Sequence, residues 1–111
     1  MSQGIFAVSF KSNTGDWGEG LIVVKNGAVN GGDSHFLYQG PVPQKTGDFR
    51  SDFIISKWRD GNTNVVGIDD YILQAEGHVN FEQGTIELSG SVKGAPQLQI
   101  ALKGNKIRDA V

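Results

Sequence analysis

The chain has 111 residues, no cysteine and a formal net charge of −2, and these three properties narrow the classes of protein it can belong to. A chain of this length forms one domain, and the lack of cysteine excludes disulfides, thiolate metal sites and thiol nucleophiles. The absence of a basic excess disfavours nucleic-acid binding, because neutralising phosphates requires clustered Lys and Arg. No stretch approaches the roughly 18 apolar residues of a membrane span and no leader pattern is present, so we expect a soluble, cytoplasmic protein.

About eight short segments alternate apolar and polar residues, which is the pattern of half-buried β-strands. In chain order we expect strands at residues 4–11, 17–25, 28–30, 35–39, 48–58, 70–79, 85–93 and 97–103. Sixteen glycines against three prolines favour tight turns between strands over a disordered tract. The residues from Gly104 onward are polar, so we expect them to fray and the folded core to span residues 4–104.

The connections are predicted from their turn residues. Asn26-Gly27 lies between apolar runs and predicts a type I′ hairpin turn, which needs positive φ at both central residues. Gly31-Gly32-Asp33 predicts a second turn of the same kind. Residues 40–47 contain two prolines and predict an irregular loop. For the apolar patch at residues 65–68 the pattern leaves open whether it packs under one end of the fold or forms a strand.

No window of helical length carries an apolar stripe, so the chain is predicted to be all-β, as a sandwich or an up-and-down antiparallel barrel. We favour a single small barrel, because short turns join successive strands and closure removes exposed edges. Side chains of one parity are expected to fill its interior: Phe6, Val8, Phe10, Phe36, Tyr38, Phe49, Phe53, Tyr71, Leu73, Ile86, Leu88, Leu98, Ile100 and Leu102. Four apolar residues of the opposite parity form the candidate dimer wall: Leu21, Val23, Ile54 and Ile72.

Several short motifs in order resemble the GrlR family of small negative regulators of type III secretion gene expression in bacteria. They are Gly4-Ile5-Phe6 with Phe10, Ser12-Asn13, Gly18-Glu19-Gly20, Lys25-Asn26-Gly27, Gly31-Gly32-Asp33 and Tyr38-Gln39-Gly40, within about the first 40 residues. Beyond Gly40 the resemblance continues only as a strand pattern. It implies a lipocalin-like (calycin-like) barrel of about eight strands, a homodimer, and regulation by binding and sequestering a transcriptional activator.

In that family a surface loop rich in Glu and Asp is implicated in the contact with the activator. The corresponding loop here has no acidic residue, so the activator-binding role does not carry over with it. It remains the candidate partner-binding loop: Pro41, Val42, Pro43, Gln44, Lys45, Thr46 and Gly47.

No catalytic or metal constellation is found, so we expect no enzyme activity, no metal and no cofactor. His35 and His78 are far apart in the sequence, and the adjacent Asp69 and Asp70 would point to opposite faces of a strand. Asp48 and Asp52 are better explained as solvated residues near a strand end. The glycine pairs lack the following helix and the Lys-Ser/Thr of a phosphate loop.

Two functions remain for a non-enzymatic barrel. One is a regulatory protein that acts by protein–protein binding, for which Trp17 and Trp58 are candidate interface anchors or barrel-end caps. The alternative is a small lipocalin-like binder of an apolar small molecule or lipid. A filled interior would favour the first function and a hollow interior the second.

Overall fold

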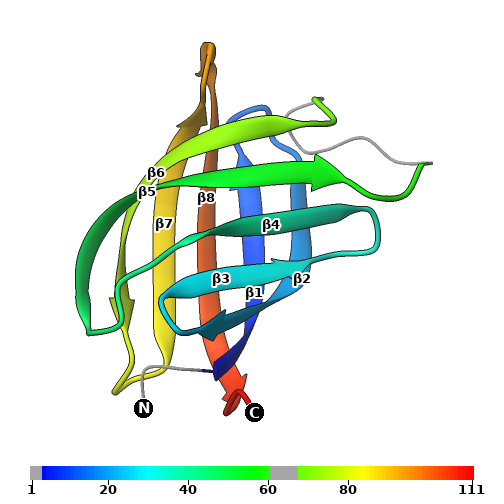
Figure 1. The fold of residues 1–111 in the computed structure, drawn as a ribbon. Coiled ribbons are helices and arrows are strands. Elements are labelled where there is room, and N and C mark those ends of the chain that lie inside the picture. The colour runs from blue at the N-terminus through cyan, green and yellow to red at the C-terminus, as the bar shows by residue number, and fades with distance from the viewer. Residues whose placement is uncertain (1–3, 61–67) are drawn as a thin grey trace.

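The structure is a computed structural model that describes residues 4–60 and 68–111. Within these residues every regular element is a β-strand, and the strands form one closed antiparallel barrel (Figure 1). The strands are β1 (Gly4–Ser12), β2 (Trp17–Lys25), β3 (Ala28–Gly32), β4 (Phe36–Pro41), β5 (Gly47–Lys57), β6 (Tyr71–Asn80), β7 (Thr85–Val92) and β8 (Ala95–Arg108). Each strand pairs with the next, and β8 pairs with β1, which confirms the predicted up-and-down barrel.

The core lies inside the barrel, because successive side chains of a strand point to opposite faces of the sheet. In β7, Ile86 and Leu88 are buried while Glu87 and Ser89 are exposed. Phe6, Ile86, Val24 and Val79 are the largest side chains that are almost completely buried. Each such burial stabilises the fold by about 1.5–3 kcal/mol relative to leaving the side chain in water.

The hairpin between β2 and β3 has the predicted turn. Asn26 and Gly27 have φ angles of 54° and 78°, as a type I′ turn requires at its two central positions. The twist of this turn matches the right-handed twist of the two strands, so Val24 and Val29 pair directly and both point into the core.

The second predicted turn is wrong, because Gly31 and Gly32 belong to β3. A Cβ atom on Gly31 would lie 2.5 Å from the Cα atom of Ile22, so glycine here allows β2 to approach closely. The chain turns at Asp33–His35 instead, and β4 begins at Phe36 and not at His35.

The predicted fraying from Gly104 onward is also wrong. β8 continues to Arg108, and its last residues pair with β1 to close the barrel. The register shifts between Ile5 and Phe6, which is a bulge at the end of this long pairing. Polar composition misled the prediction, because backbone pairing with β1 keeps Lys106 and Arg108 in the sheet although their side chains are not apolar.

The remaining predicted strands need only small corrections. The observed ends of β1, β2, β5, β6 and β7 agree with the predicted ends to within one residue. The predicted irregular loop is shorter, because Pro41 belongs to β4 and Gly47 to β5. The predicted apolar patch lies outside the described residues except for Ile68, which packs against the core.

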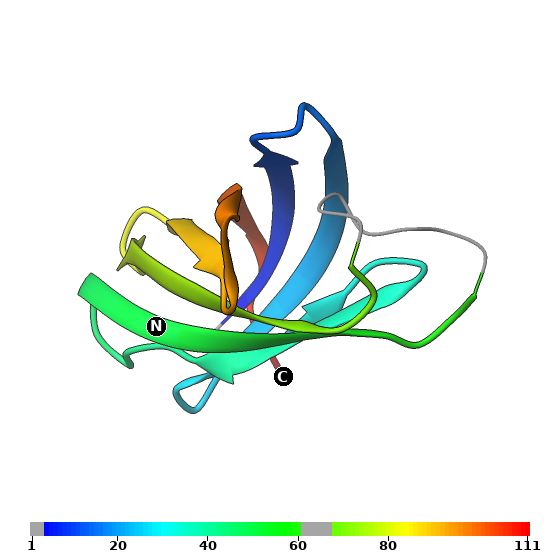
Figure 2. The same ribbon diagram turned by 90° about the horizontal axis from the view of Figure 1, so that it is seen from above.

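β6 and β7 approach each other closely where two inward-facing positions are glycines. A Cβ atom on Gly77 would lie 2.7 Å from the Cβ atom of Leu88, and one on Gly90 would lie 2.9 Å from the Cα atom of Ala75. These contacts are shorter than ordinary carbon–carbon contacts of about 3.5–4.0 Å. Glycine therefore permits the strong curvature of these strands, which is visible from above (Figure 2).

β5 is paired unequally on its two sides. Its residues Gly47 to Ile55 pair with β6, but only Ile54 to Lys57 pair with β4. The chain leaves β4 at Val42, whose backbone N–H donates to Gly27 O at 2.9 Å and whose side chain is buried. In Figure 1 the left-hand part of β5 curves away from β4. The N-terminal half of β5 is therefore paired on one side only within the described residues.

Candidate functional site

The candidate dimer wall lies on the outside of the barrel, as its parity predicted. Leu21, Val23 and Ile54 are 51%, 36% and 55% exposed. Ile72 is half-buried and pairs with Ile54 on the neighbouring strand. Leu37, which the sequence analysis did not include, adds a further apolar side chain that is 40% exposed.

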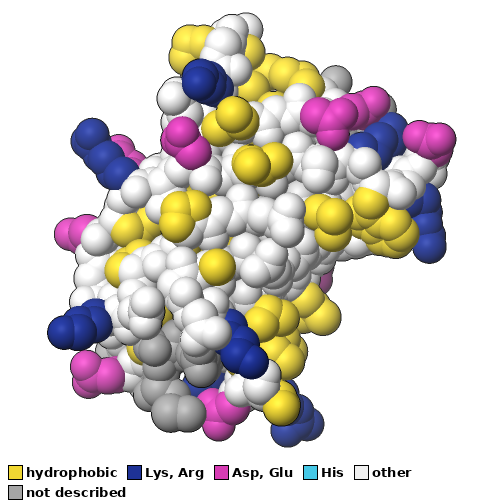
Figure 3. All heavy atoms as spheres, in the orientation of Figure 1, with side chains coloured by type: hydrophobic (Ala, Val, Ile, Leu, Met, Phe, Trp, Pro, Cys, Tyr) yellow, Lys and Arg dark blue, Asp and Glu magenta, His cyan; other side chains and the backbone are white. Residues whose placement is uncertain are grey.

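The wall is not one continuous apolar surface. Across the sheet, Val23 pairs with Asn30, Asn30 with Gln39, and Gln39 with Ile54. Gln39 Nε2 donates to Asn30 Oδ1 at 3.0 Å, so a polar pair separates the two apolar halves. Figure 3 shows this mixed character, with hydrophobic side chains over the middle of the face and most charged side chains round its rim.

Every residue of the candidate interior is buried or partly buried in the structure. Nine of the fourteen are buried, and Phe10, Phe49, Tyr71, Leu98 and Leu102 are partly buried and pack against them. The prediction missed eight further core residues: Ile22, Val24, Val29, Val42, Ile55, Ala75, Val79 and Val92. Strand parity could have identified Ile22 and Val24, since they alternate with the outward Leu21 and Val23.

A small apolar cavity of about 50 Å³ lies in the interior, lined by aromatic and aliphatic side chains such as Phe10, Tyr38 and Tyr71. Aromatic rings fill most of the space: Phe10 and Tyr38 meet edge to face at 5.8 Å, and Phe49 and Phe53 do so at 6.5 Å. Small-molecule sites are usually about 300–1,000 Å³. The cavity in this structure is far below that range.

Asp33 organises the β3–β4 turn and contacts Tyr38, one of the residues that line this cavity. Its carboxylate accepts hydrogen bonds from the backbone N–H groups of His35 at 2.9 Å and Phe36 at 2.8 Å, and from the hydroxyl of Tyr38. Its carbonyl oxygen accepts from Trp58 Nε1 at 3.2 Å. Burial, together with the bond to Asp33, raises the pKa of the Tyr38 phenol well above its usual value. This arrangement holds the β3–β4 turn.

The two histidines lie apart. His78 Nδ1 is 2.8 Å from Asp48 Oδ1 on the outside of the barrel, where the two side chains are 42% and 92% exposed. His35 Nδ1 lies 2.9 Å from Ser34 Oγ in the β3–β4 turn. In residues 4–60 and 68–111 no group of three or more His, Cys, Asp or Glu side chains could hold a metal ion.

The paired aspartates have structural partners. Asp70 Oδ1 accepts from the backbone N–H of Lys57 at 3.1 Å, and Asp69 Oδ1 lies 3.2 Å from Lys57 Nζ. They therefore tie β5 to the start of β6. Asp52 lies on the outer face of β5, four residues after Asp48, and is exposed.

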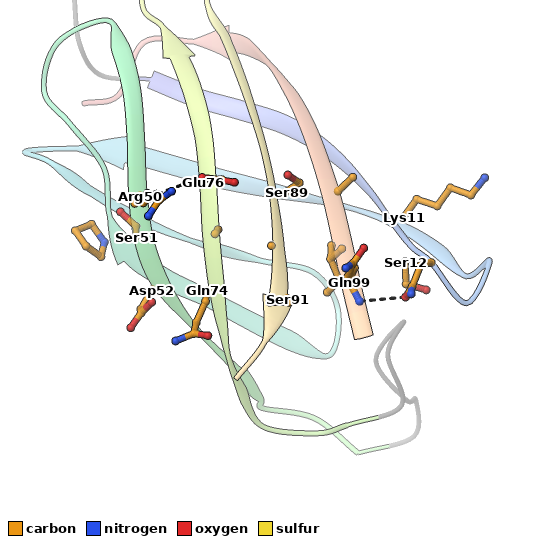
Figure 4. A pocket seen from close by; sticks show the side chains of 16 residues that line it. Lys11, Ser12, Arg50, Ser51, Asp52, Gln74, Glu76, Ser89, Ser91 and Gln99 are labelled. Atoms are coloured by element: carbon orange, nitrogen blue, oxygen red, sulfur yellow. Dashed lines mark hydrogen bonds and ion pairs between the residues drawn. The ribbon is translucent and has the colours of Figure 1, made fainter. Parts of the chain in front are cut away.

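A shallow polar hollow crosses the outer face of β5, β6, β7 and β8 (Figure 4). It has a volume of about 1120 Å³, and its lining includes small side chains such as Ser89, Ser91 and Ala101. Arg50 Nε lies 3.2 Å from Glu76 Oε2 at one side of the hollow. Both side chains are largely exposed, so this ion pair contributes little to stability.

The candidate partner-binding loop is only partly available on the surface. Val42 is 6% exposed and belongs to the core, whereas Gln44, Lys45 and Thr46 are exposed. Thr46 Oγ1 accepts from the backbone N–H of Phe81 at 3.0 Å and anchors the end of the loop. The loop can therefore offer a partner only a short polar tip.

The fold places this chain among closed eight-stranded up-and-down β-barrels. No helix in the described part of the chain is long and apolar enough to cross a membrane. Comparison with models of known protein families gives no match, and comparison with curated protein sequences gives none either.

Proposed function

We propose that this chain is a non-enzymatic regulatory protein that acts by binding another protein, as a homodimer, in the manner of the GrlR family that it resembles. The partner is expected to be a transcriptional activator, which the bound barrel would keep from acting. The resemblance in the first 40 residues supports this assignment, as does the barrel topology that the family shares.

The observation that carries the proposal is the contrast between the two faces of the sheet. The interior is almost filled, while Leu21, Leu37 and Ile54 leave large apolar side chains on the outside. Grouped apolar side chains on the surface of a soluble protein mark sites of protein association. A barrel of this kind is suited to presenting a surface to another protein.

The partner contact must differ from the acidic loop of the family. The exposed tip of the equivalent loop is Gln44-Lys45-Thr46, which carries one positive charge and no negative charge. The candidate dimer wall together with Leu37, called the apolar outer wall from here on, is therefore the better candidate for the contact with the partner. The loop tip would contribute at its edge.

The test is capture of the partner from the native host with the tagged barrel. Val23→Asp and Ile54→Asp should each abolish capture, because each places a charge within the apolar outer wall. Ser89→Asp is the matched control, since it adds the same charge to the polar face of β7 and should leave capture intact.

Loss of capture in all three variants, or in none, would contradict the proposal. Native mass spectrometry of the purified protein distinguishes the proposed regulatory function from the alternative, which is binding of a small apolar molecule. An adduct that is lost on denaturation would identify a binder of a small apolar molecule whose interior opens beyond the cavity seen here.

A further inference from the structure

The N-terminal half of β5 presents an unpaired strand edge. Residues Gly47 to Ser51 pair with β6 on one side, and no backbone hydrogen bond joins their other side to the rest of the described chain. Gly40 approaches β5 only beyond this segment, where a Cβ atom on it would lie 2.9 Å from Asp52 O. An exposed strand edge is a template for pairing with another strand, and native proteins usually cover it.

The backbone groups that face this edge belong to Asp48 and Arg50. In an antiparallel ladder alternate residues direct their N–H and C=O groups to opposite neighbours. The backbone N–H of Trp58 donates to His35 O across the β4 side, and that of Lys57 donates to the Asp70 side chain across the β6 side. Even-numbered residues of β5 therefore point toward the free edge.

The side chains along this edge carry a self-complementary charge pattern. Asp48, Arg50 and Asp52 alternate in sign on the outer face, and the Asp48 and Arg50 side chains are 92% and 87% exposed. Within the barrel Asp48 contacts His78 and Arg50 contacts Glu76, and their high exposure leaves both able to reach a second copy as well. When two copies of Gly47–Ser51 pair antiparallel about Phe49, each Asp48 stands opposite Arg50 of the second copy. A register centred on Arg50 would instead place the two arginines opposite each other.

From this edge and its charges we propose that β5 is the seam of a homodimer, in which the two barrels join into one continuous sheet through Gly47–Ser51. The pairing forms four backbone hydrogen bonds, donated and accepted by Asp48 and Arg50 of both copies. It also forms two Asp48–Arg50 ion pairs and brings the two Phe49 side chains together on the inner face. The inference rests on the proposed homodimer and names its contact, which leaves the apolar outer wall free for the partner protein.

A charge exchange tests the seam, with the dimer dissociation constant measured by analytical ultracentrifugation. Asp48→Arg and Arg50→Asp should each raise it by about tenfold or more, because each places like charges opposite each other. The double variant restores opposite charges and should return to within about threefold of the unchanged protein. Lys11→Asp is the control, because it reverses a charge on β1, which is paired on both sides, and should have no effect.

A cysteine scan tests the register in a chain that has no cysteine of its own. Phe49→Cys places the new thiols opposite each other at the two-fold axis and should give a disulfide-linked dimer under mild oxidation. Ser51→Cys stands opposite Gly47 of the second copy and should not. Cross-linking of Ser51→Cys alone would overturn the proposed register.

The outcomes separate this inference from the proposed function. In one outcome the unchanged protein is dimeric, while the double variant has a dimer dissociation constant as high as those of the single variants. That result would overturn the seam and leave the homodimer in place. An unchanged protein that is monomeric at high concentration would overturn both the seam and the homodimer. Capture of the partner protein, which tests the regulatory role, is measured independently of either result.

Discussion

Gly77 provides a sensitive test of how tightly the barrel is packed. It points inward from β6, opposite Leu88 of β7. In Gly77→Ala the added methyl group would lie 2.7 Å from Leu88 Cβ and 2.8 Å from Leu88 Cα. These distances fall about 1 Å short of an ordinary carbon–carbon contact. The nearest atoms belong to or adjoin the backbone of a paired strand, so they cannot rotate away and the strands must move apart.

Overpacking of this kind lowers the free energy of unfolding by about 1–3 kcal/mol. A urea m-value of about 1.5 kcal/mol per molar would convert that loss into a fall of about 1–2 M in the unfolding midpoint. Far-UV circular dichroism during urea titration measures the midpoint. All variants are compared at one protein concentration, because dimerisation would make the apparent stability depend on it.

Gly47→Ala is the matched control for Gly77→Ala. A Cβ atom on Gly47 meets no atom within 4 Å, and its φ angle is not positive. The substitution restricts the unfolded chain, so the midpoint should stay the same or rise by up to about 0.7 M. Equal midpoints for the two variants would show that β6 and β7 are not as close at this point as the structure has them.

Three further predictions concern single features of the fold. Burial and the hydrogen bond to Asp33 raise the pKa of Tyr38 above the ordinary value of about 10, so the stability it contributes is complete below about pH 10 and falls as the pH rises further. Urea midpoints measured between about pH 9 and 11 should therefore decline less in Tyr38→Phe than in the unchanged protein, and parallel declines would contradict this account. Val42→Ala should lower stability by about 1–3 kcal/mol because its side chain is buried, whereas Gln44→Ala in the same loop should change the midpoint by less than about 0.5 M. Truncation after Gly104 should abolish cooperative unfolding, since it removes the part of β8 that pairs with the start of β1; a truncated chain with the midpoint of the full chain would mean that this pairing is dispensable.

The hydrophobic pattern predicted the barrel because each strand buries one face and exposes the other. In β7 the alternation of Ile86 and Leu88 with Glu87 and Ser89 is sufficient to assign both strand and orientation. Asn26-Gly27 predicted its turn because few other residue pairs adopt positive φ at two successive positions. These are local properties, and the chain around each residue determines them.

The errors arose where a distant strand decides the outcome. The pattern at Gly31 and Gly32 predicts a turn, but the close approach of β2 requires glycine there. The polar residues Lys106 and Arg108 predict a frayed end, but β1 supplies a pairing partner for them. The prolines on either side of Val42 predict an exposed loop. The hydrogen bond from its backbone N–H to Gly27 O instead holds Val42 where its side chain packs into the core.

The candidate surfaces show the same contrast between local properties and those that distant strands decide. The sequence by itself determined which side chains of each strand share a face, and hence that Val23 and Ile54 point outward, because that follows from the two-residue repeat of a strand. Only the tertiary structure decided that Asn30 and Gln39 separate them, and that β5 leaves β4 before Gly47–Ser51 can be paired. Both depend on which strands become neighbours and where their pairing ends, and these are properties of the closed sheet as a whole.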